Sequence, residues 1–148
     1  MSKGAVHIDL TEFRKWQKNL EASWQRFEDE FLIKFLLESA DLVLRKTKPR
    51  TPVRTGDLRR GWALGKIIVY NNNLGVEIIN NAWHDLETIF GKDKAHYYAS
   101  HIEYGFTLPN GSYYPGRYML TISLAEVRQS MPSRFDSAFK AWVKVHEI

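Results

Sequence analysis

The residues able to do acid–base or metal chemistry in this 148-residue chain are five histidines and 17 Asp and Glu residues. His96 and His101 are five positions apart, so neither a helix nor a strand would place both on one face. No third ligand stands at a usual metal-site spacing from His84-Asp85 or from Asp93 and His96. The chain has no cysteine, which excludes zinc–thiolate sites, iron–sulfur clusters, disulfides and a cysteine nucleophile. We therefore expect no catalytic residues, no metal, no cofactor and no small-molecule substrate.

Glu103 lies between Ile102 and Tyr104, which predicts that its carboxylate is partly buried. Burying a carboxylate is costly unless it is paired, and pairing with an arginine is more common than catalysis. Arg59 and Arg117 are the partners that we expect for it. The chain is then left without a general acid or base at a recognisable spacing, so we expect that it is not an enzyme.

A basic segment is the strongest charge feature of the chain. Between Arg45 and Arg60 it holds seven Lys and Arg residues against one Asp, a net charge of +6, whereas the whole chain carries +4. Such a segment could contact several phosphates non-specifically, but no aromatic residue that could stack on bases is interleaved in it. The alternatives are a solubilising loop and a surface that faces an acidic partner protein. The candidate partner-facing or DNA-facing residues are Lys48, Arg50, Arg54, Arg59 and Arg60.

The elements that would position these residues begin with a long amphipathic helix, predicted over residues 10–46. Asp9 and Glu12 have the spacing of a capping box, and Pro49 and Pro52 should end the helix. At 1.5 Å per residue the helix would be about 55 Å long, more than a compact domain of this size accommodates. It therefore either breaks near residues 28–30 or packs partly on another subunit. Its apolar face, at steps of three and four residues, consists of Phe13, Trp16, Leu20, Trp24, Phe27, Phe31 and Phe35.

A β-hairpin is predicted next, over residues 59–80. Its strands are expected at about 59–70 and 76–79, because β-branched residues cluster there, and three consecutive Asn residues at 71–73 predict the turn. The mixed and polar residues 83–96 are typical of a loop with one short helical turn.

The C-terminal part is predicted to be mainly helical. Pattern alone leaves residues 97–105 open as a strand or a short helix that ends at its glycine. Pro and Gly residues predict a loop over 106–116. Two helices are expected within residues 117–146, the first over about 118–128 and the second with Pro132 in its first turn.

These elements predict one α+β domain over residues 1–148. We expect a long N-terminal helix packed on a small antiparallel sheet, whose core is a β-hairpin, with C-terminal helices. A single hairpin is marginal alone, so it should lie on the helix or pair further. No apolar stretch approaches the roughly 20 residues of a membrane span, and the first residues lack a signal-peptide pattern. We therefore expect synthesis in the cytoplasm and no membrane contact.

Three segments, taken in order, resemble a known family. They are residues 51–62 (TPVRTGDLRRGW), 98–105 (YASHIEYG) and 115–120 (PGRYML). With the preceding helix and the hairpin between them, they resemble the phage "putative tail-component" family over about residues 42–127. The chain differs from the family at Gly61, where the family often has Ser, and in a longer connection at 83–96.

The resemblance implies a structural role. Members of this family sit in the head–tail joining region, or neck, of long-tailed phages and prophages. The implied role is to join head and tail or to complete the tail, as a homo-oligomeric ring that contacts phage connector and tail proteins and, non-specifically, packaged DNA. Attachment on the head side and on the tail side both stay open. The alternative is a cytoplasmic protein that binds nucleic acid non-specifically or has a regulatory role.

The family motifs imply architectural residues and contain no catalytic set. Gly56 and its two neighbours would form a tight turn, because glycine accepts backbone angles that other residues resist, and Leu58 would then enter the core. Gly105 would end the second motif's element, and Gly116 would begin the next helix. The motif positions with an expected structural role are Thr55, Gly56, Leu58, Tyr98, Ala99, Glu103, Gly105, Gly116 and Leu120.

Overall fold

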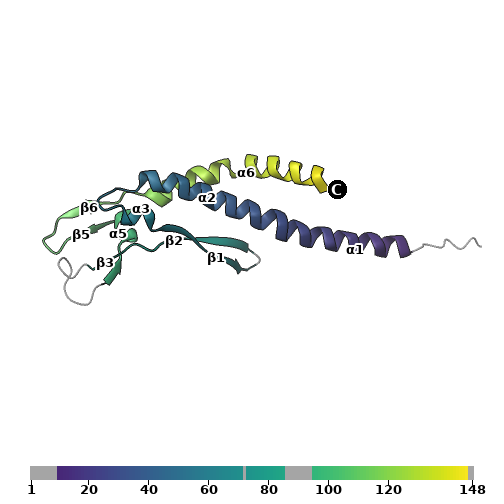
Figure 1. Ribbon diagram of the computed structural model, residues 1–148, viewed down its shortest axis with the longest axis horizontal. Helices are drawn as coiled ribbons and strands as arrows, with labels where there is room; N and C mark the ends of the chain where they lie inside the picture. The colour runs from purple at the N-terminus through teal and green to yellow at the C-terminus, as the bar shows by residue number, and fades with distance from the viewer. Residues whose placement is uncertain (1–9, 72, 86–94, 147–148) are drawn as a thin grey trace, which may run out of the picture. The chain divides into compact units, whose positions relative to one another are not determined.

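The computed structural model describes residues 10–71, 73–85 and 95–146 (Figure 1). The chain divides into two compact units, Met1–Lys34 and Phe35–Ile148, and each is described by itself. The elements in chain order are α1 (Leu10–Arg26), η1 (Phe27–Leu32), α2 (Ile33–Arg50), α3 (Asp57–Arg60), β1 (Trp62–Tyr70), β2 (Asn73–Asn80), β3 (Trp83–Asp85), β4 (Ala95–Tyr97), α5 (Ala99–Tyr104), β5 (Gly105–Thr107), β6 (Tyr113–Pro115) and α6 (Met119–His146).

The backbone is helical at every residue from Leu10 to Arg50, so the long N-terminal helix is confirmed and runs past residue 46. No break occurs near residues 28–30. That segment belongs to η1, a π-helical stretch whose hydrogen bonds span five residues instead of four. The three acidic side chains there are exposed within the helix, so they need no break to reach solvent. The capping box predicted from Asp9 lies outside the described residues.

Pro49 lies in the last turn of α2, so the prediction that it ends the helix is wrong. A proline near the end of a helix removes one N–H donor, which the final turn tolerates better than the interior. The N–H of Thr51 donates to the carbonyl oxygen of Lys48 at 3.1 Å and closes the helix. The buried hydroxyls of Thr47 and Thr51 donate back to the carbonyl oxygens of Val43 and Thr47, at 2.8 and 2.9 Å.

A short helix, α3, takes the place of the first predicted strand residues. Gly56, which directly precedes α3, has a φ of +88°. The tight turn predicted at this glycine is therefore confirmed. The N–H groups of Arg60 and Gly61 donate to the carbonyl oxygens of Gly56 and Asp57, at 3.0 and 2.8 Å. These local bonds hold a helical turn, and the predicted strand start at about Arg59 is therefore wrong.

β1 and β2 form the predicted hairpin. They pair antiparallel on both sides of a β-bulge, where the register shifts between Leu64 and Ile67. Asn71, in the turn, has a φ of +48°, a conformation that asparagine tolerates better than most residues. β2 begins at Asn73, so the return strand is longer than the predicted 76–79.

Two further antiparallel strand pairs occur where loops are predicted, at the two ends of 83–96 and within 106–116; the short helical turn predicted in 83–96 falls on residues 86–94, which lie outside the described residues. β3 pairs antiparallel with β4, and β5 pairs antiparallel with β6, with Phe106 opposite Tyr114. The turn formers of the second segment close this hairpin, with Gly111 at a φ of +85°. Each sheet in the described part of the chain has two strands.

One helix, α6, replaces the two predicted C-terminal helices, and it begins at Met119 rather than at 117 or 118. Pro132 lies inside it instead of in a first turn. Pro132 is exposed, so the carbonyl that lacks its N–H partner can bond to water. The helix therefore continues through the proline.

The core of the second unit brings α2, α3, β1 and α6 together. Its central cluster of buried residues is Leu44, Leu58, Trp62, Ala82 and Met119. Near the N-terminal end of α2, the rings of Phe35 and of Phe135 in α6 pack edge to face, with their centroids 5.3 Å apart. The predicted α+β fold is confirmed: a long N-terminal helix, small antiparallel sheets and a C-terminal helical segment.

Candidate functional site

The parts of the chain that the structure describes contain no grouping of three or more His, Asp or Glu residues suited to hold a metal ion. His84 and His96 are paired opposite each other in the β3–β4 hairpin. The ring of His101 packs against the edge of Phe106, with centroids 6.0 Å apart. No helix among the described residues is both long and apolar enough to cross a membrane. The remaining candidates are therefore grooves, charged segments and exposed apolar surfaces.

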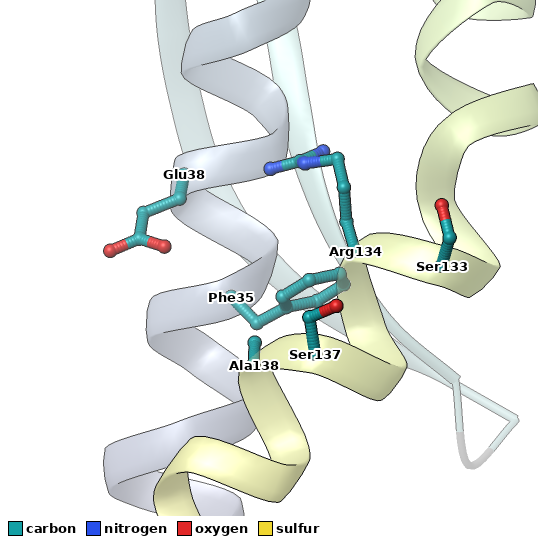
Figure 2. Close-up of a pocket in the computed structure, with 6 residues that line it drawn as sticks. All are labelled: Phe35, Glu38, Ser133, Arg134, Ser137 and Ala138. Atoms are coloured by element: carbon teal, nitrogen blue, oxygen red, sulfur yellow. The ribbon is translucent and has the colours of Figure 1, made fainter.

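A groove runs between α2 and α6, and Figure 2 shows Arg134 reaching from α6 toward α2 above the ring of Phe35. The guanidinium carbon of Arg134 lies 5.6 Å from the centre of that ring, and its Nη1 lies 3.4 Å from Oγ of Ser39. The hydroxyl of Ser133 donates to the carbonyl oxygen of Ser130 at 3.1 Å. No histidine lines the groove to activate a serine. The residues that line it are Phe35, Glu38, Ser133, Arg134, Ser137 and Ala138.

The basic segment is partly used inside the molecule, and Arg50 is the clearest case. Its guanidinium donates to a carboxylate oxygen of Glu126 at 2.5 Å and to the hydroxyl of Ser123 at 3.1 Å. Lys46 donates to the other oxygen of Glu126 at 3.0 Å. The hydrogen bond from Lys46 lowers the pKa of Glu126, and the positive charges of Arg50 and Lys46 add to the effect against a partial loss of hydration. These contacts tie the end of α2 to α6.

Arg59 and Arg60 also bind within the chain. Arg59 donates to the carbonyl oxygen of Thr51 at 3.0 Å, which holds the loop after α2 against α3. Arg60 donates to the carboxylate of Asp57 at 2.5 Å and to the carbonyl oxygen of Thr55 at 3.4 Å. These two arginines therefore stabilise the turn that they follow.

Lys48 and Arg54 are the two candidate cations whose side chains are exposed and make no ion pair or hydrogen bond within residues 10–71, 73–85 and 95–146. The predicted basic surface thus divides into three arginines with internal partners and two side chains directed to solvent. Sequence alone shows the charge of such a segment but not which charges are already paired.

The first motif forms the turn and a buried anchor. The hydroxyl of Thr55 donates to the carboxylate of Asp57 at 2.6 Å. Leu58 is buried in the central cluster, as predicted. A Cβ at Gly61 would lie 2.5 Å from the amide oxygen of Asn80, so a larger residue there would displace that side chain. Glycine at position 61 therefore allows the chain before β1 to lie close to Asn80 at the end of β2.

Glu103 is buried, but the predicted pairing with Arg59 or Arg117 is wrong. One carboxylate oxygen accepts the backbone N–H of Leu120 at 3.0 Å. The other accepts the N–H and the hydroxyl of Thr121, at 2.8 and 2.7 Å. The first N–H groups of a helix have no partner within the helix, and a carboxylate is favoured at that end. Glu103 therefore caps α6 from outside.

The glycines of the second and third motifs allow backbones to approach closely. Gly105 ends α5, as predicted, with a φ of +87°, and a Cβ there would lie 2.6 Å from the carbonyl oxygen of Tyr114. Gly116 does not begin the next helix, which starts three residues later at Met119. A Cβ at Gly116 would lie 2.5 Å from the carbonyl oxygen of Glu103. Because neither glycine has a side chain, the end of α5 can lie close to the segment that leads into α6.

Tyr98, Ala99 and Leu120 are partly buried against the central cluster, which gives these motif positions a packing role. Burial raises the pKa of Tyr98, and the negative charge of Asp57 raises it further. The phenol group therefore stays protonated at neutral pH.

Two exposed apolar surfaces were not predicted as candidate sites. On β1, three consecutive side chains are exposed: Ile67, Ile68 and Val69. Their run of β-branched residues predicts a strand but not its exposure. A second group surrounds the β5–β6 hairpin and the start of α6, and its exposed rings belong to Tyr104, Tyr113, Tyr114 and Tyr118. The high aromatic content of the chain was the available signal for this group.

Comparison with known families identifies the chain. The family described as "Bacteriophage HK97-gp10, putative tail-component" matches residues 14–105, which is more than half of the 148 residues and includes the first two motifs. The chain belongs to this HK97-gp10-like family of phage tail components, and the resemblance seen in the motifs is confirmed. No curated protein and no solved structure matches the chain.

Proposed function

We propose that the chain is a structural subunit of the virion neck, which joins head and tail or completes the tail as a homo-oligomeric ring. The observation that carries the proposal is the family match over residues 14–105 to phage tail components. The subunit would act in the assembled virion through contacts with phage connector and tail proteins, without catalysis.

The exposed apolar strand supports a role in assembly. Ile67, Ile68 and Val69 are 43%, 45% and 75% exposed. A contiguous apolar patch on a soluble subunit commonly marks an interaction surface, whereas scattered apolar residues do not. In an assembled virion, a neighbouring subunit would cover such a patch and remove it from water.

The nucleic-acid-binding alternative has less support, because Arg50, Arg59 and Arg60 have partners within the chain. Lys48 and Arg54 are the side chains that we propose for a non-specific contact with packaged DNA. Binding of the purified chain to duplex DNA, measured at several salt concentrations, tests this role. Tight, strongly salt-dependent binding without any phage partner would favour the alternative.

Deletion of the gene from an inducible lysogen tests the neck role, with electron microscopy of the particles beside a complemented control. We expect separate filled heads and free tails, and joined particles once the gene is restored. Normal infectious particles after deletion would overturn the proposal. Filled heads without any tails would instead place the protein in tail assembly.

A further inference from the structure

We propose that neighbouring copies of this chain contact each other through the β1–β2 hairpin, with the outer edge of β1 in one copy paired to the outer edge of β2 in the next. The occupant of each edge is thus a second copy of the chain. This inference deepens the proposed function, because it assigns the surface that would close the ring.

The first support is the unfinished sheet. In the described residues β1 and β2 form a sheet of two strands, so each strand has one edge without a ladder partner there. A free edge presents a row of backbone N–H and C=O groups that can pair with another strand. A two-stranded sheet is also marginal by itself and gains stability when strands are added.

The second support is the pattern of exposure. Successive side chains of a strand point to opposite faces of the sheet, so exposure of Ile67, Ile68 and Val69 in sequence leaves both faces of this part of β1 accessible to solvent. A partner helix lying on the sheet would cover one face. A strand added at the edge brings neighbouring side chains to both faces, and it therefore fits this pattern better.

The third support is charge. Lys66 is the one charged residue of β1, and Glu77 is the one charged residue of β2, and both are exposed. Pairing of β1 with β1 leaves each lysine without an acidic residue on the facing strand, and pairing of β2 with β2 leaves each glutamate without a basic one. Pairing of β1 with β2 brings opposite charges together, which stabilises neighbouring strands. Charge thus favours a head-to-tail contact, the type that generates rings.

The hairpin also indicates a register. Within one chain Ile67, Ile68 and Val69 lie opposite Val76, Gly75 and Leu74. The same register between chains keeps adjacent hairpins in step. It places Val69 of one copy opposite Leu74 of the next, and it brings Lys66 of one copy beside Glu77 of the next, because both residues lie at the bulge next to the Ile67–Val76 pair.

A charge exchange between copies tests the contact in particles. Lys66→Glu and Glu77→Lys are supplied, separately or together, to a lysogen that lacks the gene. Each alone places like charges at every contact, and we expect joined infectious particles to fall at least about tenfold. Supplied together, alternating copies restore opposite charges between chains, so the titre should rise well above that of either variant. Within each variant chain the two residues stay alike in charge, so mixing cannot repair a folding defect.

Disulfide trapping gives a readout that does not depend on particle formation. The chain has no cysteine, so Val69→Cys and Leu74→Cys, carried on separate chains and expressed together, provide the reactive thiols. We expect cross-linked pairs that contain one chain of each variant. Val53→Cys, used in place of Val69→Cys, is the matched control, because Val53 is also exposed but lies outside the hairpin. It should form no cross-link with the Leu74→Cys chain.

The outcomes separate the two proposals. Unchanged titres for both charge variants, no gain on mixing, or cross-links mainly between two Val69→Cys chains would each overturn the head-to-tail contact. If the gene deletion leaves particles normal while the mixed cross-link forms, the neck role fails and the contact between copies stands.

Discussion

The carboxylate of Glu103 accepts hydrogen bonds from both the backbone N–H and the hydroxyl of Thr121, at 2.8 and 2.7 Å. Its second oxygen accepts the N–H of Leu120. The first turn of α6 contains no acidic residue of its own. A carboxylate from α5 therefore supplies the negative charge and the acceptors that the start of α6 lacks, and it fastens the two helices together.

Replacing Glu103 with Ala should lower the free energy of unfolding by about 2–4 kcal/mol, because the first N–H groups of α6 lose the buried, charged acceptor that they share. Glu103→Gln should cost less, since its amide oxygen can still accept. Urea unfolding followed by circular dichroism measures both. Glu28→Ala, at an exposed helical position, is the control and should change stability little. Equal losses for Glu103→Ala and Glu28→Ala would remove the capping role.

Trp62 and Thr51 form a buried polar pair. The indole N–H of Trp62 donates to the hydroxyl of Thr51 at 2.9 Å, and both residues are buried. Thr51→Val should cost about 1–3 kcal/mol, because it leaves a buried donor without an acceptor. Thr51→Ser should cost less. Thermal unfolding monitored by tryptophan fluorescence measures the effect.

A double-mutant cycle tests that this cost belongs to the pair. The loss of stability from Thr51→Val combined with Trp62→Phe should be smaller than the sum of the two single losses, because no donor is then left without an acceptor. Strictly additive losses would show that the two groups act independently.

Gly105 and Gly111 share a positive φ, but Gly105 also has a ψ of 166°, which residues with a side chain avoid, and a crowded position. Both have φ near +86°, at +87° and +85°, but a Cβ at Gly105 would lie 2.6 Å from the carbonyl oxygen of Tyr114, whereas a Cβ at Gly111 meets nothing within 4 Å. Gly111→Ala should cost about 1–2 kcal/mol from backbone strain alone. Gly105→Ala should cost clearly more, as measured by urea unfolding. Similar costs would show that neither the crowding nor the backbone conformation at Gly105 requires glycine there.

Glu126 should titrate below its ordinary pKa of 4.5, because Lys46 and Arg50 stabilise its charged form. Because the pKa of Glu126 is lower in the folded state than in the unfolded chain, its ionised carboxylate stabilises the fold at pH values above the ordinary pKa. That contribution is lost as pH falls through the lowered pKa. An NMR pH titration of the Glu126 carboxyl measures the midpoint, and Lys46→Met should move it upward. An unchanged midpoint would exclude Lys46 as the main cause.

The elements predicted correctly are those that local sequence determines. The period of apolar residues gives the helix that ends at Arg50, and the β-branched run with Asn71 at its turn gives the β1–β2 hairpin. The β5–β6 hairpin was missed because its strands are three residues each and are separated by the same Pro and Gly residues that also form loops. Pro132 was misplaced because a proline on an exposed helical face does not have to end the helix.

Side-chain partners were harder to predict than elements. Thr121, the partner of Glu103, lies 18 residues further along the chain, so no local spacing points to it. Arg50 pairs with Glu126 across 76 residues, and the net charge of its segment does not indicate this. Positions such as Gly56 and Leu58 were identified because the motif that contains them is contiguous. Burial of the strand faces was not predictable, because β-branched residues favour strands whether or not a neighbour covers them.

The exposed run on β1 also constrains how the protein can be made. Ile67, Ile68 and Val69 are uncharged, β-branched and accessible before any neighbour has arrived. Segments of this kind can stack into aggregates, and the flanking Lys66 is the type of residue that delays such stacking. The fraction of free subunit that aggregates should therefore rise with its concentration. Synthesis in the infected cell would then have to keep pace with consumption by assembling particles, because a large excess of free subunit would aggregate.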